Sequence, residues 1–409
     1  MELSQCKERL DAWFSGKEAE MLAMLERIVN MDSFTSDAAD VNRVGEMVTG
    51  WLAEAGFHTA KLPKKPAPAD EQWMNGLGNV FTARTHAMEC GPGIVFLAHM
   101  DTVFPAGTAA ARPFRLDRAA DRATGPGVTD MKAGIVQNMF VAKALKELGL
   151  MDVPMTLTFS PDEELGSPST TPILGEQLNG AQAAICTEPG YHNGGVTLER
   201  KGSGHMFLEI KGISAHAGRC YQDGASAILE LAHKILAFDK HVDLAHDTTV
   251  NTGLVSGGTS ANSVAPNASA RIHITFKTLE AGRKLAEALR TETAKTFIPG
   301  TSSHISGGVR LPPLVPTPSV MKLFALAEQA GELIGYSIHS EPSKGTAESG
   351  YCSSVLGVPA ICSMGPEGSN LHSADEYMIP STFVPRCKLA ALTAIQAARA
   401  FAPAAKVSL

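Results

Sequence analysis

The sequence predicts an α/β protein whose main domain is interrupted by a smaller α+β domain. Nearly continuous apolar runs alternate with helical patterns along the first half of the chain, which is typical of strands covered by helices on both faces. From about Ser203 the pattern changes to strand, helix, strand, strand, helix, and after about residue 310 the first pattern returns. The order of these patterns therefore predicts an insertion within a larger α/β domain.

The elements before the insertion follow from the spacing of apolar residues. Helical spacing predicts helices over residues 18–31, 38–55 and 132–148. Apolar runs predict strands over residues 79–83, 93–98, 155–159 and 183–186. A glycine- and proline-containing stretch at 125–127 precedes the third helix, so we expect a tight turn there.

The insertion has elements of its own. We expect strands over residues 207–210, 248–255 and 268–276, and helices over 225–238 and 279–296. The proline-rich stretch 311–318 is expected to return the chain to the first domain, which continues with a helix over 320–333, a strand over 358–363 and a helix over 384–401. The predicted domains are residues 1–202 (catalytic domain, first part), 203–309 (inserted dimerisation or lid domain) and 310–409 (catalytic domain, second part).

Composition excludes several classes of protein. Of 409 residues, 44% are hydrophobic and 19% charged, which is ordinary for a soluble globular protein. The formal net charge of −7 argues against nucleic acid as the main partner. We expect no signal peptide and no membrane span, because no apolar run has the required position or length. The seven cysteines are scattered and never spaced as C-x-x-C, which predicts reduced thiols and a cytoplasmic location.

Three neighbouring carboxylates, Asp162, Glu163 and Glu164, follow the predicted strand 155–159. Inside a regular buried strand they would be costly, because successive side chains point to opposite faces. At the C-terminal end of a strand they can converge on a cleft, where open α/β sheets bind ligands. Taken alone, such a triplet is more often a solvated acidic turn, so the other strand ends must decide between the two interpretations.

Those strand ends also carry residues that ligate metal ions. His99 and Asp101 follow the strand 93–98, and the other candidates at strand ends or loops are Asp130, Glu188 and His372. Imidazole and carboxylate groups are ligands of zinc and similar divalent ions. Two histidines and several acids exceed the needs of one tetrahedral ion, and a pair of ions about 3.5–4 Å apart fits the number better.

These segments resemble the M20 metallopeptidases, and within them the glutamate carboxypeptidase type. The resemblance covers about residues 18–400 and rests on five segments in the family's order: His99-Met-Asp-Thr-Val-Phe-Pro105, Gly125-Pro-Gly-Val-Thr-Asp-Met-Lys-Ala-Gly134, Asp162-Glu-Glu-Leu-Gly166, Glu188-Pro189 and His372-Ser373. It implies a zinc-peptidase-type three-layer catalytic domain with an inserted α+β dimerisation domain.

The resemblance also implies a di-metal site. Two divalent ions are expected, zinc first, with manganese or cobalt as alternatives. Asp130 would bridge them, with His99 and Glu188 completing the ligands of one ion, and Glu164 and His372 those of the other.

The resemblance gives the catalytic roles to two further acids. Glu163 would be the general base, taking a proton from the attacking water and passing it to the leaving nitrogen. Asp101 would hold the imidazole of His99 by accepting its other N–H.

Motifs of the inserted domain add substrate-binding candidates. Lys211-Gly-Ile-Ser-Ala-His-Ala-Gly218 resembles a family segment whose histidine, here His216, reaches the active site of the partner subunit and supports the oxyanion, which implies a homodimer. Gly257-Gly-Thr-Ser-Ala-Asn-Ser-Val-Ala265 resembles another segment, with Asn262 as a substrate contact. Arg310, before Leu-Pro-Pro, resembles an arginine that clamps a substrate carboxylate, although its register differs by one residue.

Two segments depart from the family pattern. His273–Lys277 lacks the usual Asp-Val-Arg, and Lys344–Glu348 stands where the family has Gly-Gly-Thr-Ser-Asp. These departures affect the expected substrate more than the metal chemistry.

The function expected from these residues is metal-dependent hydrolysis of an amide bond. The substrate would be a small molecule or short peptide with a free carboxylate, either a C-terminal glutamate-like amino acid that is released or an N-acyl amino acid that is deacylated. The alternatives are hydrolysis of a non-peptide C–N bond, such as an aryl amide or aryl amine, and a catalytically silent metal-binding dimer. Retention of Glu163 argues against the silent binder, which has no use for a base.

Overall fold

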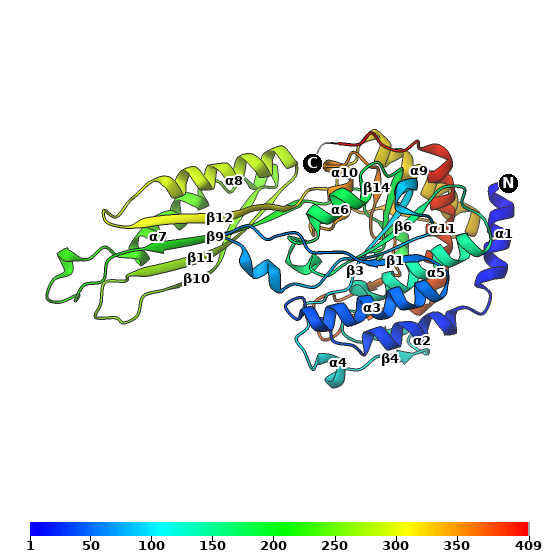
Figure 1. The fold of residues 1–409 in the computed structure, drawn as a ribbon, viewed down its shortest axis with the longest axis horizontal. Coiled ribbons are helices and arrows are strands. Elements are labelled where there is room, and N and C mark those ends of the chain that lie inside the picture. Colours follow the sequence, from blue (N-terminus) through cyan, green and yellow to red (C-terminus); the bar gives the residue numbers. More distant parts are fainter. Residues whose placement is uncertain (408–409) are drawn as a thin grey trace. The chain divides into compact units, whose positions relative to one another are not determined.

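The structure is a computed structural model that describes residues 1–407 (Figure 1). Its internal contacts divide the chain into two compact units. The first unit comprises Met1–Ala67, Gln72–Arg200 and the chain from Leu314 onward, and the second comprises Pro68–Glu71 and Lys201–Pro313. The predicted insertion 203–309 lies within the second unit, which also takes in the short segment 68–71.

The first unit is built on a six-stranded sheet with the order β1-β2-β6-β3-β7-β14. Its strands are β1 (His58–Lys61), β2 (Phe81–Arg84), β3 (Ile94–His99), β6 (Met155–Ser160), β7 (Ala183–Cys186) and β14 (Ala360–Ile361). The four strands β6, β3, β7 and β14 run parallel, whereas β2 is antiparallel to both β1 and β6. Every residue of β3, β6 and β7 is buried, as the continuous apolar runs predict.

Helices cover this sheet (Figure 1). The helices of the first unit are α1 (Leu3–Phe14), α2 (Glu18–Val29), α3 (Ala38–Glu54), α4 (Thr108–Ala111), α5 (Ala133–Glu147), α6 (Thr171–Leu178), α9 (Pro318–Ile334), α10 (Ser349–Ser354) and α11 (Phe383–Ala400), and several of them pack on the sheet. Helix α5 packs on β3 and β6, α11 packs on β3 and β7, and α3 packs on β1 and β2. The side chain of Asp37 caps α3 by accepting from the N–H groups of Ala39 and Asp40 at 3.1 Å.

Two smaller sheets complete the first unit. One has the order β15-β16-β5-β4 and the other pairs β13 with β8. Their strands are β4 (Arg115–Asp117), β5 (Arg122–Thr124), β8 (Gly195–Val196), β13 (His339–Ser340), β15 (Gly368–Ser369) and β16 (Tyr377–Met378). Strands β15 and β16 flank the loop that carries His372, so this small sheet fixes both ends of the loop.

The second unit is a four-stranded antiparallel sheet with the order β10-β11-β9-β12. Its elements are β9 (Gly202–Lys211), α7 (Ala227–Asp239), β10 (Thr249–Gly257), β11 (Asn267–Phe276), α8 (Leu279–Ala294) and β12 (Ser302–Leu311). Alternate residues of β11 are buried, and they form a core with apolar side chains of α7 and α8. The two helices therefore cover the apolar face of this sheet (Figure 1).

A fully buried lysine joins the two helices of the second unit. Lys234 of α7 donates to the carbonyl oxygens of Glu292 and Thr293 at 2.9 Å and lies 3.2 Å from the carboxylate of Glu230, one turn earlier. The second oxygen of Glu230 accepts from the N–H of Ile298 at 2.7 Å. This network satisfies the carbonyl groups at the C-terminal end of α8, which have no partner inside the helix.

Replacing Lys234 with methionine is expected to lower the free energy of unfolding by about 3 kcal/mol, because the buried carboxylate of Glu230 loses its cation and the carbonyl groups of Glu292 and Thr293 lose a donor. The thermal midpoint of purified protein measures the change. Lys284→Met is the matched control, since the Glu280–Lys284 pair has the same helical spacing and 76% of each side chain is exposed. The control should change stability by less than about 0.5 kcal/mol. Equal losses in both variants would contradict the role assigned to Lys234.

The α/β fold class and the major helices and strands predicted from the sequence are confirmed, with shifts of a few residues at their ends. Several strands were missed, namely β1 at the edge of the large sheet and the short strands β4, β5, β8, β13, β15 and β16. The longest missed strand is β12, which covers Ser302–Leu311, and its last residue falls in the stretch predicted as a linker. The segment is rich in serine and glycine, which have weak strand preference, and it becomes a strand because it pairs with β9. Helix α1 and the shorter helices α4, α6 and α10 were not predicted either.

Within residues 1–407, no helix combines the length and the apolar composition needed to cross a membrane.

Candidate metal centre

The parallel strands β3, β6 and β7 end at one edge of the large sheet. His99 at the end of β3 pairs in register with Ser160 of β6, and Leu97 pairs with Cys186 of β7. The residues that follow the three strands therefore emerge side by side. They are Asp101 after β3, Glu163 and Glu164 in a 3₁₀ turn after β6, and Glu188 after β7.

Asp130 reaches the same edge from the turn before α5. The turn starts at Gly127, whose φ of +69° is left-handed and whose added Cβ would lie 2.5 Å from the side chain of Thr102. Glu376 holds the turn by accepting from the N–H groups of Gly127, Thr129 and Asp130 at 2.9–3.1 Å. The backbone of Asp130 is thus fixed by a carboxylate from a distant part of the chain.

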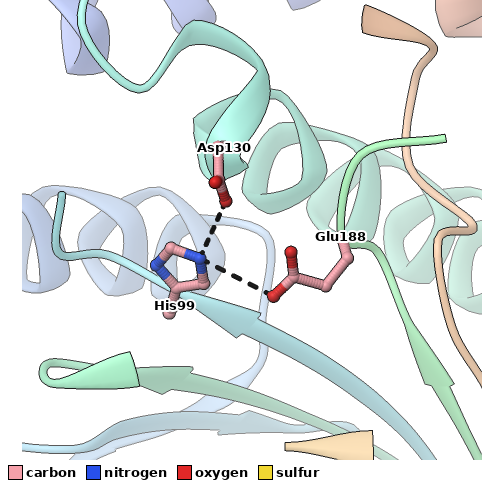
Figure 2. A group of neighbouring side chains, drawn as sticks. All are labelled: His99, Asp130 and Glu188. Atoms are coloured by element: carbon pink, nitrogen blue, oxygen red, sulfur yellow. Dashed lines mark hydrogen bonds and ion pairs between the residues drawn. The ribbon is translucent and has the colours of Figure 1, made fainter. Parts of the chain in front are cut away.

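The first ligand group consists of His99, Asp130 and Glu188, all buried (Figure 2). Nε2 of His99 lies 3.2 Å from Oδ1 of Asp130 and 3.7 Å from Oε1 of Glu188. Figure 2 shows both carboxylates directed at this one nitrogen. The three side chains come from three separate elements and converge on one point.

The second ligand group consists of Asp130, Glu164 and His372. Nε2 of His372 lies 3.2 Å from Oδ2 of Asp130 and 3.1 Å from Oε2 of Glu164. His372 is half exposed and has a left-handed φ of +60°, which is uncommon for a residue other than glycine. The two oxygens of Asp130 therefore face different groups, Oδ1 toward His99 and Oδ2 toward His372.

The spacing of these atoms suits a pair of zinc-type ions. Two ligand atoms that are each about 2.0 Å from a tetrahedral ion lie about 3.3 Å from one another. The histidine–carboxylate distances of 3.1–3.7 Å agree with that spacing. A carboxylate with one oxygen in each group is the arrangement expected of a bridging ligand.

The cluster of carboxylates in the site also favours a cation. Within residues 1–407, no lysine or arginine forms an ion pair with the five carboxylates Asp101, Asp130, Glu163, Glu164 and Glu188. The residues present therefore fit two divalent ions in ligand type, spacing and charge.

The pKa values of the site reflect this excess of negative charge. Burial raises the pKa of Glu188 to about 8, and burial together with the charge of Glu188 raises the pKa of Glu163. Hydrogen bonds to Asp130 and to a neighbouring glutamate raise the pKa of His372 to about 11. Burial lowers the pKa of His99, but hydrogen bonds to neighbouring aspartates outweigh burial and raise it. Protons on the histidines thus supply positive charge that metal ions would replace.

Asp101 holds the acidic turn as well as the imidazole. The N–H groups of Glu163 and Glu164 donate to its two carboxylate oxygens at 3.1 and 3.2 Å, and the hydroxyl of Thr35 donates at 2.8 Å. Nδ1 of His99 lies 3.0 Å from the backbone carbonyl oxygen of Asp101 and 3.4 Å from its carboxylate. The family resemblance implies that the carboxylate accepts this N–H, but the carbonyl oxygen is the closer acceptor.

The loops that carry Glu188 and His372 are tied to each other by buried groups. Glu367 accepts from the N–H of Gly194 at 2.8 Å, and Arg386 lies 3.4 Å from the same carboxylate. Arg386 is fully buried in α11 and also donates to the carbonyl of Gly195 at 3.1 Å. These contacts hold the chain after Glu188 against the chain before His372.

The substrate-binding candidates of the insertion lie in the second unit. The segments of His216 and Asn262 are adjacent, since the N–H of Ala217 donates to the carbonyl of Asn262 at 3.0 Å. Both side chains are exposed. Arg310 forms a short, nearly buried ion pair with the carboxylate of Glu71. The sequence motif did not indicate this partner within the chain.

Sequence reasoning did not assign roles to Glu376 and Glu367. Glu376 lies four residues after His372 and immediately before β16. Its position close to a predicted ligand was the one feature of the sequence that could have indicated a role. Neither carboxylate belongs to a ligand group; each acts on backbone N–H groups. Their contribution depends on contacts that only the folded chain defines.

Comparison with known proteins identifies the family. The model of peptidase family M20/M25/M40 matches residues 95–396. Carboxypeptidase G2 of Pseudomonas sp. (strain RS-16) is 25% identical over 389 residues, which cover 90% of this chain and 87% of that protein.

Solved structures show the same fold at low sequence identity. An M20 family metallo-carboxypeptidase of Sulfolobus solfataricus has a TM-score of 0.73 at 16% identity and covers 93% of this chain and 99% of its own. A dinuclear metal-binding peptidase of the M20 family from Bacillus subtilis has a TM-score of 0.63 at 15% identity and covers 94% of this chain and 99% of its own. Since the family model matches well over half of the sequence, the chain belongs to peptidase family M20/M25/M40.

Proposed function

We propose that this protein is a di-metal hydrolase that cleaves an amide bond, releasing a C-terminal glutamate-like amino acid or deacylating an N-acyl amino acid. One observation carries the proposal. Asp130 directs one carboxylate oxygen to each of two ligand groups, and Glu163, which is next to Glu164 in the chain, belongs to neither group. A site that only stored metal would need the ligands but not the neighbouring free carboxylate.

The ligand groups support zinc, with manganese or cobalt as alternatives. His99, Asp130 and Glu188 would hold one ion, and Asp130, Glu164 and His372 the other. When bound, the two ions would polarise the scissile carbonyl and acidify water.

The side chains of the protein would perform the proton transfers. Glu163 would accept a proton from the attacking water and deliver it to the leaving nitrogen, because an amine must be protonated to leave. Its backbone N–H is bonded to the carboxylate of Asp101, so the base is held by the same residue that contacts His99. Asp101 would thereby keep the base and a metal ligand in a fixed relation.

The second unit would supply oxyanion and substrate contacts through His216 and Asn262, with a second copy of this chain completing the site. Strand β10 pairs only with β11, which leaves one of its edges without a strand partner in the described residues. Leu254 and Val255 on this strand are 64% and 60% exposed. An exposed apolar edge strand favours pairing with another chain, so this edge supports a homodimer. The cytoplasmic location inferred from the cysteine pattern is part of the proposal.

A second candidate substrate is a molecule with a non-peptide C–N bond, such as an aryl amide or aryl amine. The observation that favours it is the ion pair between Arg310 and Glu71, because a guanidinium that already binds a carboxylate of the chain is not free for that of a substrate. The departures at His273–Lys277 and Lys344–Glu348 point in the same direction.

A turnover screen tests these proposals. Protein reconstituted with zinc, manganese or cobalt would be assayed with peptides ending in glutamate, N-acyl amino acids and aryl amides. Turnover of either of the first two classes is the expected result. Turnover of aryl amides alone would favour the second candidate. Two bound ions with no turnover of any class would reject the hydrolase and favour a silent metal-binding protein.

A further inference from the structure

The acidic turn that carries Glu163 and Glu164 is held by hydrogen bonds rather than by core packing. As whole residues, Glu163, Glu164 and Leu165 are only partly buried, and none of them belongs to the hydrophobic core. The chain leaves the turn through Gly166 and Ser167, whose φ angles of +84° and +51° are both left-handed. Polar contacts must therefore fix the position of the two glutamates.

Some of these contacts are local. The carbonyl of Asp162 accepts from the N–H of Ser167 at 2.9 Å, and its carboxylate accepts from the N–H and the hydroxyl of Ser169 at 2.7 and 2.6 Å. These bonds close the loop on itself but do not attach it to another part of the protein.

Glu348 provides an attachment from a distant segment. The hydroxyl of Ser167 donates to Oε1 of Glu348 at 2.8 Å, across 181 positions of the sequence. Burial raises the pKa of Glu348, whereas the nearby hydroxyl of Ser160 lowers it, and Ser160 pairs with His99 in the sheet. One carboxyl group thus binds the exit of the acidic turn and lies near the strand position that pairs with His99.

The segment that presents Glu348 is itself anchored. Arg200 is buried and donates to the carbonyl oxygens of Gly345 and Thr346 at 3.3 and 3.4 Å and to the hydroxyl of Ser343 at 3.3 Å. Arg200 therefore anchors residues 343–346, which come immediately before Glu348 in the first unit. Glu348 can thus act as a fixed support.

The hydrogen bond between Ser167 and Glu348 explains why each residue is present, although each would lower stability on its own. Glu348 is only 3% exposed, and within residues 1–407 it forms no ion pair with lysine or arginine. Ser167 has a left-handed backbone conformation in which glycine would cost less. Each residue is needed because of its bond to the other.

We infer that Glu348 is a positioning residue that holds Ser167 and thereby fixes Glu163 and Glu164 relative to the rest of the metal centre. The inference rests on the proposed function. The segment Lys344–Glu348, which departs from the family pattern, would then act on the turn that carries Glu163, through the side chain of Glu348.

Variants of both partners test the inference. Glu348→Ala is expected to lower kcat about 10- to 100-fold, as changes behind metal ligands commonly do, with KM changed less than about twofold. Glu348→Gln keeps an acceptor oxygen for Ser167 and should restore most of kcat. Ser167→Ala should match Glu348→Ala, and the double variant should lose no more than either single one.

Two further variants separate positioning from stability. Ser167→Gly removes the hydroxyl but suits the left-handed backbone, so the thermal midpoint should be maintained while kcat still falls. Asp152→Ala, an exposed change outside this contact and both ligand groups, should leave both unchanged. A wild-type kcat in Ser167→Gly would overturn the inference. So would losses of kcat that are no larger than the fraction of unfolded protein in each variant.

The visible spectrum of cobalt-loaded protein gives a readout that does not depend on turnover. Because Glu164 is on the same turn, Glu348→Ala and Ser167→Ala should alter the Co²⁺ absorption bands, whereas Asp152→Ala should not. If the wild type hydrolyses no amide, the proposed function fails, yet altered bands in these two variants still support the positioning role. Unaltered bands in both variants overturn it.

Discussion

Replacing Glu163 with glutamine is expected to lower kcat by about three orders of magnitude while both metal ions remain bound. Glutamine has nearly the same shape but cannot accept a proton, and general acid–base catalysis contributes about 10²–10⁴-fold to rates. Glu163 belongs to neither ligand group, so ligation should be unaffected. Metal content by elemental analysis and kcat on a substrate from the screen are the two measurements.

Glu164→Gln is the matched variant on the adjacent residue. Glu164 lies 3.1 Å from His372 in the second ligand group, so its replacement should remove one ion and leave the other. The two neighbouring glutamates should therefore give opposite results, with metal retained in one variant and partly lost in the other. Equal metal loss in both variants would reject the division between base and ligand, and full activity of Glu163→Gln would reject the base.

The arrangement of the ligand strands could be predicted from the sequence because it depends on local patterns. The apolar runs of β3, β6 and β7 each end just before a ligand-type residue. Parallel strands bring their C-terminal ends to one edge, so His99, Glu164 and Glu188 had to meet. The physical rule and the pattern together were sufficient for this part of the site.

Contacts between distant segments could not be predicted in the same way. Glu376 holds N–H groups located 246 to 249 positions earlier, and Arg310 pairs with Glu71 at a separation of 239 positions. No periodicity of the sequence encodes such pairs. For Arg310 the motif suggested a substrate clamp, whereas the folded chain gives its guanidinium a carboxylate partner.

Strand β12 shows a related limit. Its serine and glycine residues have little preference for a strand, and the side-chain pattern does not alternate clearly. Hydrogen bonds to the neighbouring β9 determine its conformation. Tertiary pairing therefore decided the structure where local preference was weak.

Asp130→Ala is expected to abolish the stabilisation that metal gives to the protein. A ligand at a hundred times its dissociation constant stabilises the folded state by about 2.7 kcal/mol, so two sites would contribute about 5 kcal/mol. Because each oxygen of Asp130 faces a different ligand group, one substitution removes a ligand from both ions. The measurement is the difference in thermal midpoint between chelator-treated and zinc-saturated protein.

Variants that each lose a ligand from only one ligand group show whether Asp130 serves both groups. Glu188→Ala and His372→Ala each remove a ligand from only one group, so each should retain about half of the metal-dependent gain and one ion per chain. Asp152→Ala, an exposed aspartate outside both groups, should retain the whole gain. If Asp130→Ala kept one ion at wild-type affinity, the two groups would be independent and a bridging carboxylate would be excluded. Loss of both ions in Asp130→Ala alone is the result that only a shared ligand explains, because every other ligand faces a single ion.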